Sequence, residues 1–318
     1  MIYEQITDII NKSSKIAITS HVVPDGDNIG SSLALCLALK KLNKEVSYVI
    51  DDNIPEIYRF LKGAREIERL DSYANLDYDL VIAMDCGDLE RLGKVKQLTE
   101  HARLVNIDHH ISNTRFGEIN LVEENASATA EIAYKLIKSM GIFIDKDMAE
   151  CIYTGIVTDT GMFQYSNTSE ETHSIAAELI IAGVSPSEIF NRVYQNSPKE
   201  KVLLMKEALK SLEFYYDDKV SCITISKAQI DNITKDDLDT EGIVNLARDI
   251  AGIEAAIFLK EKEPNVIKVS LRSKNKIDVC NLAKEFGGGG HTRASGCTIK
   301  SSLEEAKQQI LQAIKKQV

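Results

Sequence analysis

Short apolar segments alternate with helical segments through the first half of the chain, and this alternation limits what it can fold into. The segment between the first two apolar runs, residues 30–44, has its apolar residues at helical spacing. Four runs have the length and β-branched composition of buried strands: KIAITS (15–20), EVSYVI (45–50), LVIAMD (80–85) and RLVNID (103–108). A strand, a helix and a second strand form a βαβ unit, so we predict an α/β fold with a mainly parallel sheet and flanking helices.

The second half of the chain begins a new alternation of strands and helices near residue 220. A length of 318 residues suits two domains better than one core. Helical patterns on either side of Pro198 separate the two alternating regions. We therefore predict a larger first domain over residues 1–190, a helical linker over 191–214 and a smaller α/β domain over 215–318.

The composition restricts the compartment and the partners. The longest apolar runs fall short of the roughly 18 residues of a membrane span, and the first residues lack the pattern of a signal peptide. Six cysteines without CxxC spacing favour reduced, buried thiols. The net charge of −10 repels nucleic acid in bulk. We expect a cytoplasmic protein that binds neither a membrane nor long duplex nucleic acid.

Acidic residues and histidines collect where predicted strands and helices end. In open α/β sheets ligands bind at the carboxyl ends of the strands. Taken singly, each of these residues is most simply a turn, a helix cap or an exposed side chain. The four segments with this chemistry contain His21, Asp25 and Asp27; Asp85; Asp108, His109 and His110; and Asp159. His101 and His173 lie outside these segments, and we expect them to be surface or packing residues.

Gathered at one edge, these carboxylates would repel one another unless cations lay between them. Carboxylate and imidazole ligands without thiolate suit Mn²⁺ or Mg²⁺, with iron or zinc as open alternatives. A pair of divalent cations is a common device for hydrolysing phosphoesters. The pattern therefore predicts a two-metal phosphoesterase site at the carboxyl edge of the first sheet.

A glycine-rich segment, FGGGGHTRASG (286–296), is the second unusual feature. Four successive glycines indicate a sharp bend or the close approach of a ligand, and backbone N–H groups beside an arginine can hold a phosphate. A flexible hinge is the simpler interpretation of glycine alone. The histidine and arginine argue against a hinge, as do six basic against two acidic residues between 268 and 293.

Read together, HVVPDGDNIGS, MDCGD, NIDHH and TDTGMF resemble the four motifs of the DHH phosphoesterase superfamily. The resemblance implies two Mn²⁺ ions, with Mg²⁺ or another divalent cation possible. It implies that Asp85 bridges both ions, that His110 lies beside the substrate phosphate and that Asp108 orients the histidines. These three residues are the implied catalytic set. The remaining implied ligands are His21 and Asp25 for one ion, and Asp27, His109 and Asp159 for the other.

The second half resembles the DHH-associated domain, through SLRSK (270–274) and the glycine-rich segment. That resemblance implies substrate contacts from Arg272, His291, Arg293, Gly288, Gly289 and Gly290. The two-domain layout is similar to the bifunctional oligoribonuclease / pAp phosphatases, whereas RecJ exonucleases are longer and family II pyrophosphatases carry a different second domain. A homodimer is a further possible partner arrangement.

The layout implies hydrolysis of short oligoribonucleotides to mononucleotides, and of 3′-phosphoadenosine-5′-phosphate to AMP. Two alternatives stay open at this point. One is a phosphodiesterase of linear dinucleotides such as pApA or pGpG, and the other is a nucleotide-binding module without catalysis. Phe163, in the TDTGMF segment, could stack on a base, although a core position is the simpler interpretation.

Overall fold

The computed structural model describes residues 2–70, 77–235, 240 and 242–318. The chain divides into two compact units, Met1–Asn196 and Ser197–Val318. The boundary falls between helix α6 (Pro186–Tyr194) and helix α7 (Lys199–Lys210), just before Pro198, which is the N-cap residue of α7. In the described residues, no helix combines the length and the apolar character that a membrane crossing needs.

The first unit contains a six-stranded sheet in the order β3-β2-β1-β4-β5-β6, and all its neighbouring strands run parallel. The predicted parallel α/β sheet is thus confirmed. The strands β3 and β6 had no counterpart in the prediction, because they are short and only partly apolar. The strands are β1 (Lys15–Ser20), β2 (Glu45–Ile50), β3 (Glu68–Arg69), β4 (Leu80–Met84), β5 (Arg103–Asp108) and β6 (Ile119–Val122).

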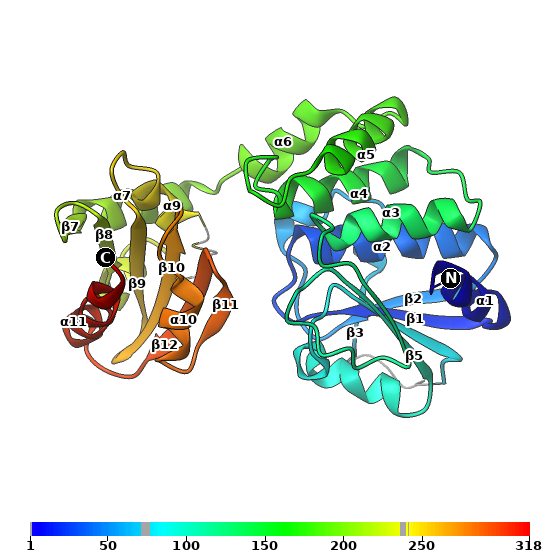
Figure 1. Cartoon of the computed structure of the whole chain (residues 1–318), viewed down its shortest axis with the longest axis horizontal. Coiled ribbons are helices and arrows are strands. Elements are labelled where there is room, and N and C mark those ends of the chain that lie inside the picture. The colour runs from blue at the N-terminus through cyan, green and yellow to red at the C-terminus, as the bar shows by residue number, and fades with distance from the viewer. Residues whose placement is uncertain (1, 71–76, 236–239, 241) are drawn as a thin grey trace. The chain divides into compact units, whose positions relative to one another are not determined.

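Helices cover both faces of this sheet. On one face α2 (Gly26–Lys41), α3 (Thr129–Ser139) and α4 (Lys146–Asp159) lie side by side (Figure 1). On the other face, Val95 and Leu98 of the 3₁₀ segment η4 (Leu89–Glu100) pack on residues of β1, β2 and β4. The other described helices of the unit, besides α6, are α1 (Ile2–Lys12), α5 (Glu170–Ile181), η1 (Glu56–Tyr58) and η2 (Ala64–Glu66).

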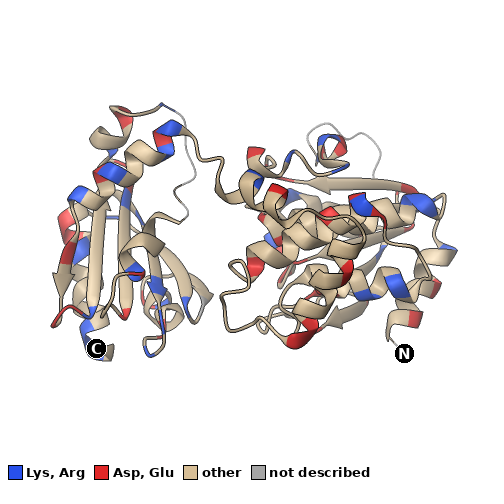
Figure 2. Cartoon of the chain, turned by 90° about the horizontal axis from the view of Figure 1, so that it is seen from above, with Lys and Arg blue, Asp and Glu red and all other residues tan. Residues whose placement is uncertain are grey.

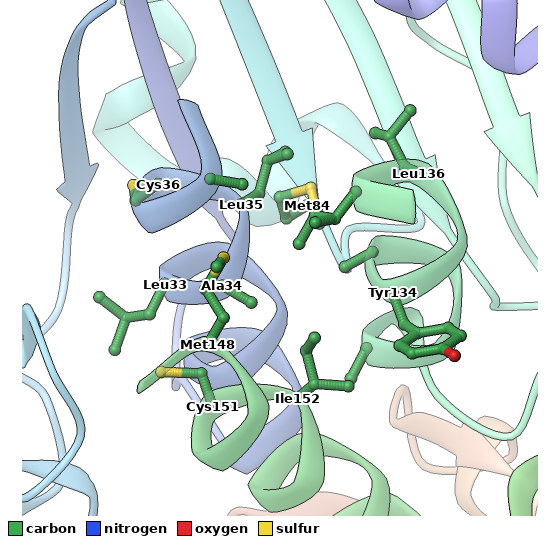
Figure 3. Close-up of a cluster of buried hydrophobic side chains, with 14 of the residues drawn as sticks. Leu33, Ala34, Leu35, Cys36, Met84, Tyr134, Leu136, Met148, Cys151 and Ile152 are labelled. Carbon is green, nitrogen blue, oxygen red and sulfur yellow. The ribbon is translucent and has the colours of Figure 1, made fainter. Parts of the chain in front are cut away.

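The main core of the first unit fills the space between the sheet and these helices. Figure 3 shows Leu35 of α2 beside Met84 of β4, and Leu33 of α2, Leu136 of α3 and Ile152 of α4 belong to the same cluster. All five side chains are at most 2% exposed. Burying such side chains contributes about 1.5–3 kcal/mol each, so this core fixes the positions of the strand ends that carry the candidate site.

The second unit contains a mixed six-stranded sheet in the order β11-β12-β10-β9-β8-β7, in which only β8 and β9 pair in parallel. Residues from α10 and α11 pack on one face, and residues from α7, α8 and α9 pack on the other. The strands are β7 (Glu213–Tyr215), β8 (Val220–Ile225), β9 (Ala255–Glu263), β10 (Val266–Ser273), β11 (Gly289–His291) and β12 (Ala294–Ile299). The helices are α8 (Lys227–Asp231), α9 (Ile243–Arg248), α10 (Val279–Lys284), α11 (Leu303–Ile314) and η5 (Lys315–Gln317).

Candidate active site

The carboxyl edge of the first sheet gathers all four predicted acidic and histidine segments. Side chains from the β1–α2 turn, from the residue after β4, from the end of β5 and from the end of α4 approach one another there. Three overlapping groups have ligand atoms within 4.8 Å of one another. These groups are His21, Asp25 and Asp85; Asp27, His109 and Asp159; and Asp85, His109 and His110.

Asp85 occupies the centre of this cluster. Its side chain is buried, and its two carboxylate oxygens face different histidines: Oδ2 lies 3.4 Å from Nε2 of His21, and Oδ1 lies 3.8 Å from Nε2 of His109. Its backbone has a φ of 52° in the left-handed region, while its amide donates to the carbonyl of Ile107 at 2.8 Å. Strained backbone of this kind concentrates at functional sites, and here it turns a carboxylate between two imidazoles.

The first two histidines are oriented by backbone carbonyls. Nδ1 of His21 contacts the carbonyl oxygen of Val22 at 2.7 Å, and Nδ1 of His109 contacts that of Ala126 at 3.2 Å. A carbonyl oxygen only accepts, so Nδ1 of each ring carries a proton, and Nε2 is the ring atom turned toward the carboxylates. A ring held through Nδ1 with Nε2 toward carboxylates has the orientation of a metal-binding imidazole, whose Nε2 would be the ligand atom.

His110 has a different environment. Its Nδ1 lies 2.7 Å from Oδ1 of Asp108, which is fully buried, and Nδ2 of Asn113 donates to the other oxygen of Asp108 at 2.6 Å. Burial opposes a charge on His110, but the hydrogen bond with Asp108 and the negative charge of Asp85 raise its pKa to about 9. The hydrogen bond with Asp108 and the charge of Asp85 thus favour the protonated form of His110 at the edge of the carboxylate cluster.

Asp27 is held at the start of helix α3. Its two oxygens accept the amides of Thr129 at 2.6 Å and Ala130 at 2.8 Å, where the positive end of the helix dipole favours a carboxylate. Glycine permits the close approach of the neighbouring helix α4, since a Cβ on Gly155 would lie 2.8 Å from Oδ1 of Asp27. Asp25, in the turn between β1 and α2, is the N-cap residue of α2, and its Oδ1 accepts the amide of Asn28 at 3.0 Å.

That capping bond starts α2 at Gly26, four residues earlier than the sequence pattern predicts. The correction brings Asp27 into the first helical turn. The predicted strand 80–85 likewise ends at Met84, because Asp85 leaves the extended conformation. Both differences lie at residues of the cluster, where local backbone follows the site and not the apolar pattern.

The electrostatics of the cluster favour an added cation. Burial, followed by the charges of Asp85 and Asp159, raises the pKa of Asp27 well above its usual range. Burial is also the main reason that the pKa of Asp159 rises to about 7. Burial would raise the pKa of Asp85 too, but the hydrogen bond with His21 and the charges of the three histidines lower it. The crowded carboxylates are incompletely compensated, and divalent cations would remove the repulsion.

The donor set fits such a cation. It consists of carboxylate oxygens and imidazole nitrogens, which suit Mn²⁺ and Mg²⁺ and accept Fe²⁺ or Zn²⁺. Cys86 is adjacent to Asp85 in sequence, but its Sγ lies 3.1 Å from the carbonyl oxygen of Asp88. Cys86 belongs to none of the three donor groups. A thiolate-free cluster of this composition matches the predicted two-metal chemistry.

In the second unit, the glycine-rich segment forms an edge hairpin. Its central residues are strand β11, which pairs with β12 so that Gly289 is opposite Gly296 and His291 is opposite Ala294. On the far side of β12, Ala294 is opposite Arg272 of β10. The backbone thus places His291 and Arg272 at the same register position on the two sides of β12, with Gly289 two positions along β11. Arg293 lies in the exposed turn, where its Nη1 donates to the carbonyl of Ile277 at 2.7 Å.

The structural reason for glycine differs from one position of this hairpin to the next. Gly288 and Gly290 lie so close to β12 that a Cβ would approach backbone atoms to 2.2 and 2.6 Å, respectively. Gly287 has a φ of +71°, which disfavours other residues. Around Gly289, in contrast, no heavy atom of the described chain lies within 4 Å of a Cβ position. Its lack of a side chain has no packing reason within this unit.

Comparison with known proteins assigns the two units separately. Residues 15–156 match the N-terminal domain of the DHH family, and residues 223–318 match the DHHA1 domain. The bifunctional oligoribonuclease and PAP phosphatase NrnA of Thermus thermophilus is 35% identical over 95% of this chain and 90% of its own length. The protein of the same name from Bacillus subtilis is 31% identical over 90% of each chain.

The chain belongs to the DHH family. It is accordingly a hydrolase of the phosphoesterase class, as are the relatives it matches. A solved structure of an exopolyphosphatase-related protein from Bacteroides fragilis superposes with a TM-score of 0.94 at 33% identity, covering 99% of this chain and 95% of that one. RecJ of Thermus thermophilus, solved with Mn²⁺, shares the fold over 54% of its length, with a TM-score of 0.57 at 11% identity and 98% coverage of this chain.

Other residues considered from the sequence have ordinary surroundings in this DHH-family structure. Phe163 packs against the core of the first unit and stacks on His173 at 5.0 Å between ring centroids. The core interpretation of Phe163 therefore agrees with its surroundings. His101 is exposed at the end of η4.

Sequence reasoning missed two groups that hold the cluster in place. Asn113 bonds to Asp108, to Oδ1 of Asn106 at 2.8 Å and to the carbonyl of Cys86 at 3.2 Å. Thr129 donates its hydroxyl to Oδ1 of Asp85 at 2.9 Å. The available signal was position: one follows the NIDHH motif by three residues, and the other opens a helix that begins with no capping side chain at Ala128.

Proposed function

We propose that this chain is a two-cation phosphoesterase that cleaves short oligoribonucleotides and removes a phosphate from 3′-phosphoadenosine-5′-phosphate. The observation that carries the proposal is the position of Asp85, whose two oxygens face the two histidines of separate donor groups. Asp85 would contact both cations, and Mn²⁺ is the ion we expect first. The other ligands would be His21 and Asp25 for one cation, and Asp27, His109 and Asp159 for the second.

Bound cations would supply Lewis acidity toward the phosphoryl oxygens and lower the pKa of attacking water. The chain's own residues supply the remaining functions. His110, with its raised pKa, presents a positive charge to a phosphate beside the cluster. Asp108 keeps that charge in place through Nδ1, and Asn113 holds Asp108 from the other side. The buried Asp27 and Asp85 keep fixed positions through donors that do not depend on substrate.

The substrate class rests on the relatives and on the second unit. Two relatives at 35% and 31% identity are named for oligoribonuclease and PAP phosphatase activity. In the second unit, Arg272 and Arg293 could bind a phosphate or nucleotide, and the uncrowded Gly289 leaves room for a ligand at the backbone. His291 belongs to the same segment and is assigned to substrate by resemblance.

The charge distribution is consistent with short substrates. Basic and acidic residues are interspersed along the helices of each unit (Figure 2), and the chain carries a net charge of −10. Affinity for long nucleic acid depends mainly on the number of phosphates neutralised. All six cysteines are unpaired, which suits the reducing cytoplasm that we propose as the site of action. The homodimer stays a prediction.

The test is a competition among substrates. Protein dialysed against EDTA and then loaded with Mn²⁺ would be incubated with RNAs from dimers to about twenty nucleotides, with 3′-phosphoadenosine-5′-phosphate and with linear pApA. We expect rapid loss of the shortest RNAs and of the bisphosphate, and none in the metal-free protein. Hydrolysis of pApA alone would replace the proposal with dinucleotide turnover. Absence of hydrolysis with Mn²⁺, Mg²⁺ or Zn²⁺ would refute it.

A further inference from the structure

One short segment, residues 126–131, bonds directly to three candidate ligands, His109, Asp27 and Asp85, although the sequence motifs leave it out. The carbonyl of Ala126 accepts from Nδ1 of His109 at 3.2 Å. The carbonyl of Ser127 accepts from Nδ2 of Asn167 at 2.9 Å, and the same Nδ2 reaches the carbonyl of Asp159 at 3.2 Å. This segment therefore joins residues from β5 and α4 before helix α3 begins.

The segment also leaves the first amides of α3 free to bind a ligand residue. Ala128, the N-cap residue, has a methyl group that cannot accept a hydrogen bond. The hydroxyl of Ser127 donates to Oε1 of Glu131 at 2.5 Å, and its amide donates to Oε2 at 3.2 Å, so Glu131 is engaged with Ser127. The amides of Thr129 and Ala130 then donate to the two oxygens of Asp27.

Thr129 is the residue that connects the two central carboxylates. Its amide donates to Oδ2 of Asp27 at 2.6 Å, and its hydroxyl donates to Oδ1 of Asp85 at 2.9 Å. Its side chain is fully buried, so water does not compete for either bond. A hydroxyl has one proton, and that proton is directed at the carboxylate whose backbone has the strained, left-handed φ of 52°.

We propose that Thr129 is a positioning residue that sets Asp85 and Asp27 in the arrangement that binds the cations. The inference rests on the proposed two-cation site but names a residue outside its ligands. The hydroxyl fixes the rotation of the Asp85 carboxylate, so that its two oxygens keep facing His21 and His109. Without the hydroxyl, the buried Oδ1 of Asp85 loses this hydrogen bond and the carboxylate can turn, which weakens cation binding before any substrate arrives.

A purely structural role for Thr129 gives a different expectation. Threonine at the first position of a helix can serve as a small buried residue, and valine has almost the same shape. In that case Thr129→Val would preserve cation affinity and Thr129→Ser, which loses a methyl group, would be the more harmful change. A positioning role predicts the reverse order.

The experiment measures Mn²⁺ affinity by calorimetry in the absence of substrate, together with the melting temperature of the EDTA-treated protein. Thr129→Val should weaken Mn²⁺ binding roughly tenfold, the usual effect of losing a partner of a metal ligand, and Thr129→Ser should restore most of it. Thr154→Val is the matched control, because Thr154 is equally buried but bonds to the carbonyl of Glu150 within its own helix.

The outcomes separate this inference from the proposed function. Wild-type affinity in Thr129→Val, or an equal loss in Thr154→Val, would overturn the positioning role. So would a failure of Thr129→Ser to recover. Substrate enters none of these titrations, so a protein that cleaves neither short RNA nor the bisphosphate would refute the proposed substrates and leave this result standing. In active protein, the loss in Thr129→Val should fall mainly on kcat at limiting Mn²⁺ and recover at high Mn²⁺.

Discussion

At the carboxyl edge of the first sheet, Asp27, Asp85 and Asp108 are at most 2% exposed, whereas Gly289 and Arg293 in the hairpin of the second unit are exposed. The buried carboxylates each accept hydrogen bonds from within the unit. The hairpin offers backbone and guanidinium groups at a sheet edge. The difference fits the two tasks that we propose for these regions: small cations need donors fixed in advance, while a substrate that arrives and leaves needs an open, positively charged surface.

The largest effect should come from the centre of the buried edge. Asp85→Asn should abolish high-affinity Mn²⁺ binding and lower kcat/KM roughly a thousandfold, equivalent to about 4 kcal/mol of transition-state stabilisation. Asp79→Asn is the control, since Asp79 precedes the same strand at the opposite edge of the sheet and is exposed. Near-normal turnover by Asp85→Asn would remove the bridging role and erase the contrast between the two regions.

A substitution in the exposed hairpin should change the KM for substrate and not the affinity for Mn²⁺. Arg293→Ala should raise KM for short RNA by roughly 10- to 100-fold, as expected for a charge-assisted bond worth about 1.5–3 kcal/mol. Mn²⁺ affinity measured without substrate should stay at the wild-type value. Lys284→Ala changes an exposed cation of the preceding helix and should leave both parameters unaltered. A loss of Mn²⁺ affinity in Arg293→Ala would contradict the division of tasks.

Neighbouring glycines provide a smaller and more selective test. Gly288→Ala places a Cβ 2.2 Å from the carbonyl oxygen of Gly296, so overpacking should destabilise the protein by about 1–3 kcal/mol. Gly289→Ala should leave the free energy of unfolding within about 0.5 kcal/mol and raise KM by roughly tenfold if a ligand occupies the open space. Denaturant unfolding and steady-state kinetics measure the two effects. Equal KM values for Gly289→Ala and the wild type would place the substrate elsewhere.

The smallest effect concerns pH and the metal-free protein. The pKa of Asp159 is raised to about 7 from 3.8, mainly by burial, and that of His110 to about 9 from 6.5, where Asp108 and Asp85 outweigh burial. A raised pKa means that the folded state binds the proton more tightly, so its stabilisation is lost as pH rises through that value. In EDTA the melting temperature should fall from pH 5 to pH 9. A flat or rising profile over that window would contradict the electrostatic account.

Strands with an apolar, β-branched interior were predictable to within a residue, because runs such as 103–108 begin and end with a polar residue. Strand β6, with one fully buried residue in four, carries too little pattern to be recognised. The convergence of His21, Asp85 and His109 followed from topology, since parallel strands bring their carboxyl ends to one edge. Asp159 ends helix α4, and only its sequence motif associated it with the others. The corrections at Asp25 and Asp85 occur where side-chain capping and a left-handed residue override the apolar period.

Thr129 and Asn113, which support the cluster, could not be identified from the sequence, for a physical reason. Thr129 and Asn113 belong to types that occur in many helices and turns, and their importance lies in the atoms that tertiary structure brings beside them. The glycines are a second case. Their sequence is one run of four identical residues, yet Gly288 is required by backbone contact and Gly289 by nothing within its own unit. Composition alone cannot separate these two reasons.

The spread of the donor groups along the chain has a consequence for biosynthesis. One group unites Asp27 from the first helix after β1 with His109 after β5 and Asp159 at the end of α4. A nascent chain that has not yet released Asp159 from the ribosome lacks this group, and non-local contacts of this kind form late because long loops must close first. Cation binding by this group would then begin only after Asp159 has been synthesised, and the free energy of binding would stabilise only chains in which the group has formed.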